Sequence, residues 1–261
     1  MIDERDRGAH DEGGIRRPEK HPFTGDEDEK DRMTPSSSLT PDLFCFLREI
    51  KTHNNREWFA RNKDRFQTAV RDPFLGVIAD LRLRLRGVSP HFIVDPSPVG
   101  GSMTRIYRDL RFSKDKSPYK VSISAHFRHA HGKEGMTPAL YLHLEPGRSS
   151  AGGGLWQPPP EGLRLIRQAI VTRTQEWKKA VSGRSFRMGC GMAGESLRRP
   201  PPGFDPEHPF IEDIKRKDFA TSVPLKEKDL LRSDPVDTIL KGYRSVVPFV
   251  RFIVQALGLP F

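Results

Sequence analysis

Tyr119-Lys-Val-Ser-Ile-Ser-Ala-His-Phe-Arg128 alternates apolar and polar residues along its whole length. Successive side chains of a β-strand point to opposite faces of a sheet, so this pattern predicts a half-buried strand. Residues 140–145 alternate in the same way and predict a second strand, in which Tyr141, His143 and Glu145 share one face. Short connections between such strands favour antiparallel pairing. Weaker strand patterns occupy residues 92–94, 101–107 and 219–223.

Helical spacing replaces this alternation on both sides of the strands. Thr40-Pro41-Asp42 is typical of a helix start, with a capping residue, a proline and an acidic first turn. Asp72-Pro73 repeats the device, and that helix is expected to end at Gly87. Helices at both the N- and C-terminal parts of the chain, packed on an antiparallel sheet, predict an α+β fold. Further helices are expected around residues 55–70, 163–181 and 211–215, and from Asp234 onward, where Pro248 should kink or end the helix.

Residues 1–38 differ in composition from the rest of the chain. They hold eleven Asp/Glu and seven Lys/Arg, a charge of −4, and few large apolar residues. Such a segment buries too little apolar surface to offset the entropy of ordering, so we expect a disordered acidic and polar tail followed by one domain over residues 39–261. Because the whole chain carries +10, that domain carries +14. This asymmetry suggests an anionic partner, a tail that screens the basic surface, or merely a basic background composition.

The cysteines and the apolar segments argue against several protein classes. Cys45 and Cys190 show no pairing with other Cys or His at metal-ligand spacing, so neither a disulfide framework nor a zinc site is expected. The N-terminus lacks the apolar run of a secretory signal. Residues 246–261 are too short and too interrupted to cross a bilayer. A cytoplasmic protein without membrane association is therefore expected.

Arg105-Ile-Tyr-Arg-Asp-Leu-Arg-Phe-Ser-Lys-Asp-Lys-Ser-Pro-Tyr-Lys120, which we call the charged segment, carries six cations and two carboxylates. A bulge or turn is expected near Arg108, which otherwise falls on the apolar face of a strand. Residues 113–118 are typical of a turn. Guanidinium groups beside a turn with free N–H groups make a receptor for phosphate or carboxylate. The ligand-binding candidates are Arg105, Tyr107, Arg108, Arg111, Lys114, Lys116 and Lys120.

Binding of an anionic small molecule or of single-stranded nucleic acid is therefore the first functional hypothesis. In a second, the protein is an enzyme whose arginines orient a phosphorylated or carboxylated substrate while Asp109, His143 or Glu145 moves protons. This hypothesis requires those groups to converge in one pocket. In a third, Asp109 and Asp115 each pair with an arginine to brace the loop, and the protein is a structural or interaction protein. Enzymatic activity stays open at this point.

Four motifs, in order, resemble one uncharacterised family, named for its domain of unknown function 2461 (DUF2461). The charged segment resembles its signature, Asn54-Asn-Arg-Glu-Trp-Phe59 its N-terminal motif and Gly152-Gly-Gly-Leu-Trp156 its central motif. Pro201-Pro-Gly-Phe204 resembles a later motif, but Pro202 stands where a basic residue is expected. The resemblance covers roughly residues 42–255 and implies no activity, because the family has none assigned.

The remaining motifs carry weaker signals. Gly152–Gly154 is neither a phosphate-binding loop nor a dinucleotide fingerprint, and a flexible corner before Trp156 is the favoured interpretation. His126, His129 and His131 do not share one strand face, so no metal site is expected, and no cofactor is indicated. His143 with Glu145 two residues away could do acid–base chemistry, although such a strand face is more often simply solvated or covered.

Overall fold

The computed structural model describes residues 38–111, 113–133, 135–183, 186 and 191–261. The expected tail, residues 1–38, lies outside this part of the chain except for Ser38, and so does Cys190.

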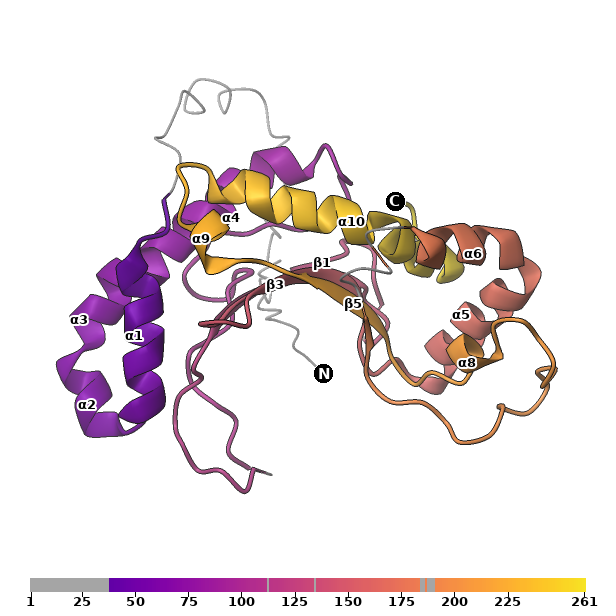
Figure 1. Ribbon diagram of the computed structural model, residues 1–261, viewed down its shortest axis with the longest axis horizontal. Helices are drawn as coiled ribbons and strands as arrows, with labels where there is room; N and C mark the ends of the chain where they lie inside the picture. Colours follow the sequence, from indigo (N-terminus) through magenta and orange to yellow (C-terminus); the bar gives the residue numbers. More distant parts are fainter. Residues whose placement is uncertain (1–37, 112, 134, 184–185, 187–190) are drawn as a thin grey trace, which may run out of the picture. The chain divides into compact units, whose positions relative to one another are not determined.

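Helices form the N-terminal part of the described chain, as expected (Figure 1). Asn55 caps the second of them, since its side-chain oxygen accepts a hydrogen bond from the N–H of Trp58 at 2.9 Å. The helix expected around residues 55–70 is instead divided at Asn62, whose side-chain amide donates to the carbonyl of Trp58. The elements are α1 (Pro41–Thr52), α2 (Arg56–Arg61), α3 (Lys63–Arg65), the π-helix η1 (Phe66–Arg71) and α4 (Asp72–Leu85).

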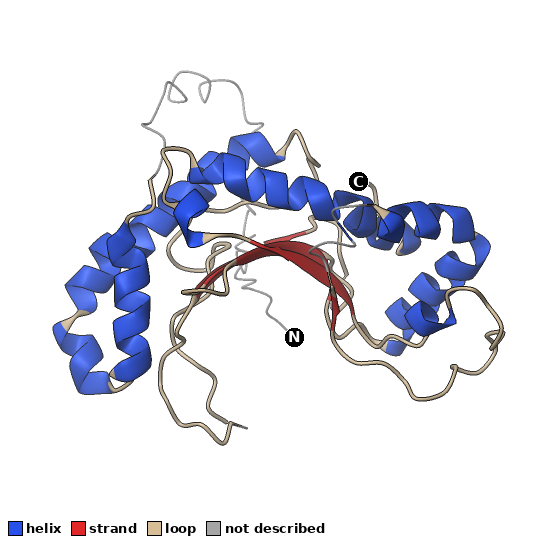
Figure 2. Cartoon of the chain, in the orientation of Figure 1, coloured by secondary structure: helices blue, strands red, loops and turns tan. Residues whose placement is uncertain are grey.

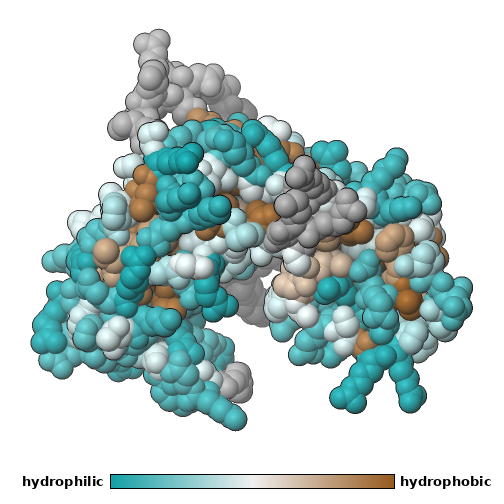
Figure 3. All heavy atoms as spheres, viewed as in Figure 1, coloured by the Kyte–Doolittle hydropathy of each residue, from teal (hydrophilic) through white to brown (hydrophobic). Residues whose placement is uncertain are grey.

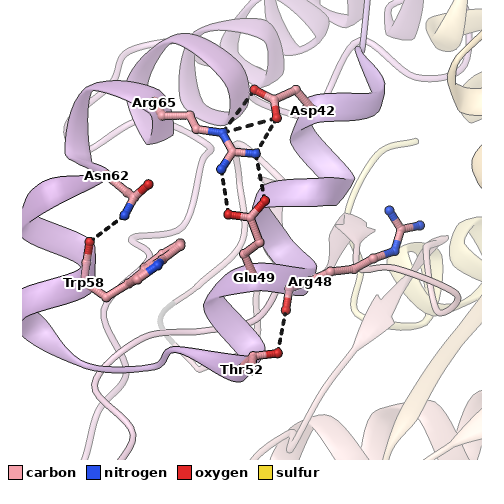
Figure 4. A network of polar contacts seen from close by, with 7 residues as sticks. All are labelled: Asp42, Arg48, Glu49, Thr52, Trp58, Asn62 and Arg65. Atoms are coloured by element: carbon pink, nitrogen blue, oxygen red, sulfur yellow. Dashed lines mark hydrogen bonds and ion pairs between the residues drawn. The ribbon is translucent and has the colours of Figure 1, made fainter.

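Arg65 ties these short helices back to α1 (Figure 4). Its guanidinium donates to Asp42 at 2.5 Å and to Glu49 at 2.7 Å, two residues about two turns apart on α1. Both carboxylates raise the pKa of Arg65, Asp42 most strongly. The guanidinium also lies 5.8 Å from the ring centre of Phe46. One side chain therefore fixes α1 against α3 through both charge and ring contact.

Within the described residues, five strands form one antiparallel sheet in the order β1-β2-β3-β5-β4. The register pairs Ser124 with His143 and His126 with Tyr141, so these four side chains share a face. The two strongest strand predictions are confirmed, although the first strand begins at Ile123, four residues later than expected. The strands are β1 (Ile123–Arg128), β2 (Ala139–Leu144), β3 (Ser150–Leu155), β4 (Met192–Ala193) and β5 (Phe219–Pro224).

Gly152–Gly154 forms the middle of β3, so the flexible corner suggested by the sequence is wrong. Gly154 has a φ of +129°, and a Cβ atom there would lie 2.1 Å from the carbonyl oxygen of Phe219. A Cβ atom on Gly152 would lie 2.3 Å from the carbonyl oxygen of Thr221. The backbones of β3 and β5 can therefore approach this closely only because both residues are glycine.

An irregular segment extends the sheet beyond β1. Met103 bridges Ala125, and Tyr107 bridges Tyr119, both in antiparallel fashion. The two bridges are out of register by two residues, so the irregularity lies on the arm that follows Tyr119, and not near Arg108 as expected. The weak strand prediction over residues 101–107 thus corresponds to isolated bridges.

The later helices differ in two respects from expectation. The helix expected over residues 163–181 is divided at Arg173, and Pro248 lies inside the last helix without ending it. The last helix packs against β3 and β5 and crosses one face of the sheet (Figure 1). These elements are α5 (Pro160–Thr172), α6 (Thr174–Ser182), α8 (Ile211–Ile214), α9 (Glu227–Leu230) and α10 (Pro235–Ala256).

The two faces of the sheet differ in chemistry. Phe127, Leu142 and Phe219 are buried on the side of α10, where the described helices that contact the sheet lie (Figure 2). The α+β fold is confirmed. We call the opposite side the open face, because no helix of the described residues packs on it. The sheet residues on this face include Ser124, His126, Arg128, Ala139, Tyr141, His143, Ser150, Gly152, Gly154, Ala220 and Ser222.

The surface of the helices at the N-terminal part is mainly hydrophilic, with hydrophobic residues in small patches (Figure 3). Across the described ranges, none of the helices combines the length and the apolar character needed to span a bilayer.

Candidate functional site

A cavity of about 510 Å³ lies on the open face of the sheet. It extends over β2, β3 and β5, and its lining includes His126, Arg128, Tyr141, Gly154, Trp156 and Ser222. A second cavity, of about 420 Å³, lies over the irregular segment beside β1 and shares His126 and Arg128 with the first. These two side chains therefore stand between the cavities, with Asp95 at the wall of the second.

The floor of the first cavity around Gly154 is almost bare backbone. Gly152 and Gly154 lie where a side chain would point toward the open face. The residues paired with Gly154 on the two neighbouring strands are Ala139 and Ala220. No side chain in this part of the floor is larger than a methyl group. Main-chain groups and a flat surface are therefore exposed to whatever occupies the cavity.

Trp156 forms part of the rim and is 55% exposed, which is unusual for so large an aromatic residue. The next residue, Gln157, has a φ of +48°, and its N–H donates to the buried carboxylate of Asp218 at 2.8 Å. The other oxygen of Asp218 accepts from the N–H of Glu195. Asp218 thus holds the turn after β3 in a conformation that leaves the indole at the cavity edge.

A continuous hydrogen-bond network crosses β1 and β2 beside the cavity. Nε2 of His143 lies 2.9 Å from Glu145, and its Nδ1 lies 3.2 Å from the hydroxyl of Ser124 and 3.1 Å from that of Tyr141. The Tyr141 hydroxyl also donates to the Ser124 oxygen at 3.0 Å. The shared face predicted for Tyr141, His143 and Glu145 is confirmed, and Ser124 joins them from the neighbouring strand.

Several basic side chains follow this edge of the sheet, and of these Arg128 and His126 line the first cavity. The side-chain ammonium of Lys120 lies 3.4 Å from the hydroxyl of Thr104, and burial followed by the charge of Arg105 lowers its pKa. Loss of hydration within the cavity wall, then Arg128 and Lys120, lower the pKa of His126 although its side chain is exposed. These groups act on one another as neighbouring positive charges, and within the described residues none of them forms an ion pair.

The charged segment is braced internally. Arg108 pairs with Asp115, and Arg111 pairs with Asp109 at 2.7 Å. The side-chain and backbone hydrogen bonds of Ser117, together with Arg108, hold the pKa of Asp115 well below its usual range. Arg111 lowers the pKa of Asp109 to about 2.

The other candidates of this segment lie apart from the first cavity. Tyr107 is 52% exposed and packs on Tyr119, while Lys116 donates to the carbonyl of Leu110 at 3.1 Å. Lys114 is exposed and forms no ion pair among the described residues. Arg108 and Lys120 line a separate cavity of about 460 Å³ that also includes Asn54.

The convergence required of an enzyme is therefore only partial. His143 and Glu145 meet, whereas Asp109 pairs with Arg111 on the charged segment. The sequence reasoning missed Arg128, although the alternation that placed His126 on one face places Arg128 there too. It also missed Trp156 as a rim residue, since nothing in the sequence tells an exposed tryptophan from a buried one.

Three imidazoles gather at one end of β1. The ring of His91 lies 5.6 Å from that of His129 and 5.7 Å from that of His131. Both nitrogens of His129 are engaged, by the carbonyl of Pro260 and the N–H of His131. In the described part of the chain, no group of three or more His, Cys, Asp or Glu residues is arranged to hold a metal ion.

Comparison with known proteins identifies a family model. A family model described as a conserved hypothetical protein (DUF2461) matches residues 42–252. This range contains all four motifs on which the resemblance rested, and the cavity on the open face as well. No curated protein and no solved structure matches the chain.

Proposed function

Because the chain belongs to the DUF2461 family of conserved hypothetical proteins, we propose a function from its own geometry: it binds an anionic small molecule in the cavity on the open face. The observation that carries this proposal is the position of Arg128 and His126 at a cavity whose floor around Gly154 holds no side chain larger than a methyl group. Ligand pockets typically combine such a concave surface with a few polar groups that fix orientation.

The charge around the cavity supports an anion. Arg128 and His126 line this cavity, whereas Lys120 and Arg105 do not; none of the four forms an ion pair within the described residues, and the pKa of His126 is lowered by burial and then by Arg128 and Lys120. A phosphate or carboxylate placed beside Arg128 and His126 would reduce the repulsion between them and accept charge-assisted hydrogen bonds. A neutral ligand would do neither.

The shape of the cavity supports a ligand with a flat part. The indole of Trp156 is exposed at the rim, and the floor around Gly154 carries only the methyl groups of Ala139 and Ala220. An aromatic or sugar ring can lie on such a floor and contact the indole, because aromatic faces favour stacking. We therefore propose a ligand with a planar ring and an attached phosphate or carboxylate.

The charged segment has a divided role in this proposal. Arg108 and Arg111 brace it through Asp115 and Asp109, which supports the bracing hypothesis for these two pairs. Arg105 and Lys120 contribute positive potential toward the cavity, as the effect of Lys120 on His126 indicates. Single-stranded nucleic acid is a second candidate ligand because its bases could use the same stacking surface. A cytoplasmic location stays a prediction.

Thermal melting of the full-length protein against a panel of anions tests the proposal. The panel contains inorganic phosphate, sugar phosphates, nucleotides, dicarboxylates and short oligonucleotides, each at about 50 and about 200 mM salt. A ligand at about one hundred times its dissociation constant stabilises the folded state by about 2.7 kcal/mol, which a melt resolves. A selective rise in melting temperature is expected for small anions that carry a ring.

Two matched variants locate the site. Arg128→Gln should weaken binding at least about tenfold, because it removes a charged hydrogen-bond donor from the cavity. Arg164→Gln removes an exposed arginine from α5 and should leave binding unchanged. Equal losses in both variants would reveal non-specific attraction. Binding that survives Arg128→Gln but is lost in Lys114→Gln would move the site to the charged segment.

A further inference from the structure

We infer that the open face holds a proton-transfer site, in which Tyr141 exchanges a proton with the bound ligand and His143, oriented by Glu145, accepts it. Tyr141 is the residue that joins the two parts of the face. It lines the cavity, and its hydroxyl belongs to the network of Ser124, His143 and Glu145. The ligand site is thereby connected to a histidine–carboxylate pair by direct hydrogen bonds.

The direction of the hydrogen bonds follows from the carboxylate. An ionised Glu145 can only accept, so Nε2 of His143 carries the proton of the 2.9 Å contact. Nδ1 then has a lone pair and must accept. The Ser124 hydroxyl donates to this atom, and the Tyr141 hydroxyl donates to the Ser124 oxygen or to Nδ1 directly. Every donor and acceptor in this hydrogen-bond network therefore has a partner of the correct type.

Burial and local support keep this arrangement fixed. The side chains of His143 and Glu145 are only 20% and 16% exposed. The hydroxyl of Ser149 accepts from the N–H of Glu145 at 3.1 Å and donates to its carbonyl at 2.9 Å. These two bonds fix the backbone of Glu145, from which its side chain extends. Arg148 lies 4.0 Å from the other carboxylate oxygen. Groups held in this way need little reorganisation when a proton moves.

Tyr141 is the member of the network that is positioned to contact the ligand. Its partner across β3 is Gly152, so no side chain stands beside its ring on that strand. The ring of His126 lies 4.7 Å away on the other side. Ser124 is only 5% exposed, which suits it to passing a proton within the network and not to attacking a ligand.

The step balances without any further reactant. A hydroxyl of the ligand, or a water beside it, gives its proton to the phenolic oxygen of Tyr141. The original phenolic proton moves to Nδ1 of His143, directly or through Ser124, and the imidazolium is stabilised by Glu145. The oxyanion that forms on the ligand lies in a cavity bordered by Arg128. One proton is transferred, and no electrons or covalent groups leave the system.

This inference rests on the open-face cavity being the ligand site, but it does not require the ligand to be an anion. Arylsulfonyl fluorides test it, because they modify a tyrosine oxygen whose proton is removed by a neighbouring base. The phenolic oxygen forms a bond to sulfur, fluoride leaves, and His143 takes the proton. Two probes of similar size are used on the full-length protein, neutral benzenesulfonyl fluoride and 4-carboxybenzenesulfonyl fluoride.

Tyr107 provides an internal control in every sample, since it is 52% exposed and its hydroxyl has no hydrogen-bond partner among the described residues. Peptide mass spectrometry gives both labelling rates. We expect benzenesulfonyl fluoride to modify Tyr141 at least about ten times faster than Tyr107 at neutral pH, despite the lower exposure of Tyr141. Glu145→Gln keeps a hydrogen-bond acceptor but removes the charge, and it should abolish this advantage without changing the rate at Tyr107. His143→Gln should do the same.

The outcomes separate the two proposals. If the carboxylated probe shows no preference over the neutral one while Tyr141 is still labelled selectively, the anion proposal fails and the proton-transfer site stands. If Tyr141 reacts no faster than Tyr107 with either probe, or if Glu145→Gln leaves its rate unchanged in a protein that melts normally, the network is structural and the inference is overturned. Protection of Tyr141 by a ligand found in the melting panel would place both activities in the same cavity.

Discussion

The side-chain amide of Asn54 forms two hydrogen bonds with the backbone of Tyr119, accepting from its N–H at 3.0 Å and donating to its carbonyl at 2.9 Å. Asn54 thus imitates a neighbouring strand at the base of the charged segment. This contact joins the N-terminal motif of the family to its signature, two stretches 65 residues apart. The asparagine therefore positions the charged segment and does not cap a helix, a role that its neighbour Asn55 fills.

Replacement of Asn54 should loosen the charged segment. Asn54→Asp keeps the acceptor for the N–H but places a negative charge against the carbonyl of Tyr119, so we expect a loss of stability of about 1–3 kcal/mol. Native-state hydrogen exchange should show reduced protection of the Tyr119 and Arg108 amides. Asn55→Ala is the matched control, because it removes only a helix cap, at a cost of about 1 kcal/mol. Equal protection of both amides in the two variants would contradict this role.

The ion pair between Arg108 and Asp115 should make the charged segment sensitive to acid. Ser117 and Arg108 lower the pKa of Asp115 in the folded protein, whereas the pKa of an unfolded aspartate is about 3.9. The folded state therefore binds fewer protons than the unfolded state in this range, and the stabilisation is complete above about pH 4 and lost as the pH falls below it.

Hydrogen exchange at the Arg108 amide, which donates to the carbonyl of Pro118 at 2.9 Å, reports this brace. We expect its protection factor to fall several-fold between about pH 5 and about pH 3 in the wild type. In Asp115→Asn it should be low already at pH 5 and change little. Asp109→Asn is the comparison, since its partner Arg111 is 77% exposed and this pair should contribute less. A protection factor at the Arg108 amide that does not change with pH in the wild type would show that the Arg108–Asp115 ion pair does not stabilise the charged segment.

Gly154→Ala should disrupt the sheet at the cavity floor. The φ of +129° is unfavourable for any residue with a Cβ atom, and that atom would lie 2.1 Å from the carbonyl of Phe219. Relief requires β3 and β5 to separate, so we expect a loss of about 3 kcal/mol or more in chemical denaturation. Gly183→Ala is the control, because its φ is −57° and no atom lies within 4 Å of the new Cβ. Similar denaturation midpoints for both variants would show that the floor tolerates a side chain.

The sequence alone predicted the α+β class and the faces of the strongest strands because both depend on local periodicity. Alternation by itself places Tyr141, His143 and Glu145 on one face. Their partner Ser124 could not be identified in this way, since its position opposite His143 depends on the register set by the connection between β1 and β2.

Other features of the site depend on contacts between distant residues. The glycines of β3 resemble a loop by composition, and only the close approach of β5 explains why glycine is needed in a strand there. The rim position of Trp156 depends on Asp218, which lies 61 residues from its hydrogen-bond partner Gln157. In the charged segment, residue types predicted both anion binding and internal pairing, and only the folded arrangement shows that Arg108 and Arg111 are paired.

The hydrogen bond between His129, at the end of β1, and Pro260 should make the stability of the protein depend on pH in the mildly acidic range. The buried imidazole of His129 donates from Nε2 to the carbonyl of Pro260 at 2.8 Å, and Phe261 packs against Phe92. Burial is the largest cause of the lowered pKa of His129, and the hydrogen bond to Pro260 opposes it. The unfolded histidine, with a pKa near about 6.5, therefore takes up a proton first as the pH falls, and stability that is complete above about pH 6.5 decreases below it.

His129→Gln isolates this contribution, because its amide can still donate to the Pro260 carbonyl but cannot titrate. We expect the fall in melting temperature between about pH 7 and about pH 5 to be smaller in His129→Gln than in the wild type. His53→Gln replaces an exposed histidine and should follow the wild-type curve. His126 also titrates with a lowered pKa, so part of the acid sensitivity should persist in His129→Gln and disappear only when both are replaced. An unchanged pH dependence in the double variant would assign the acid sensitivity to other groups.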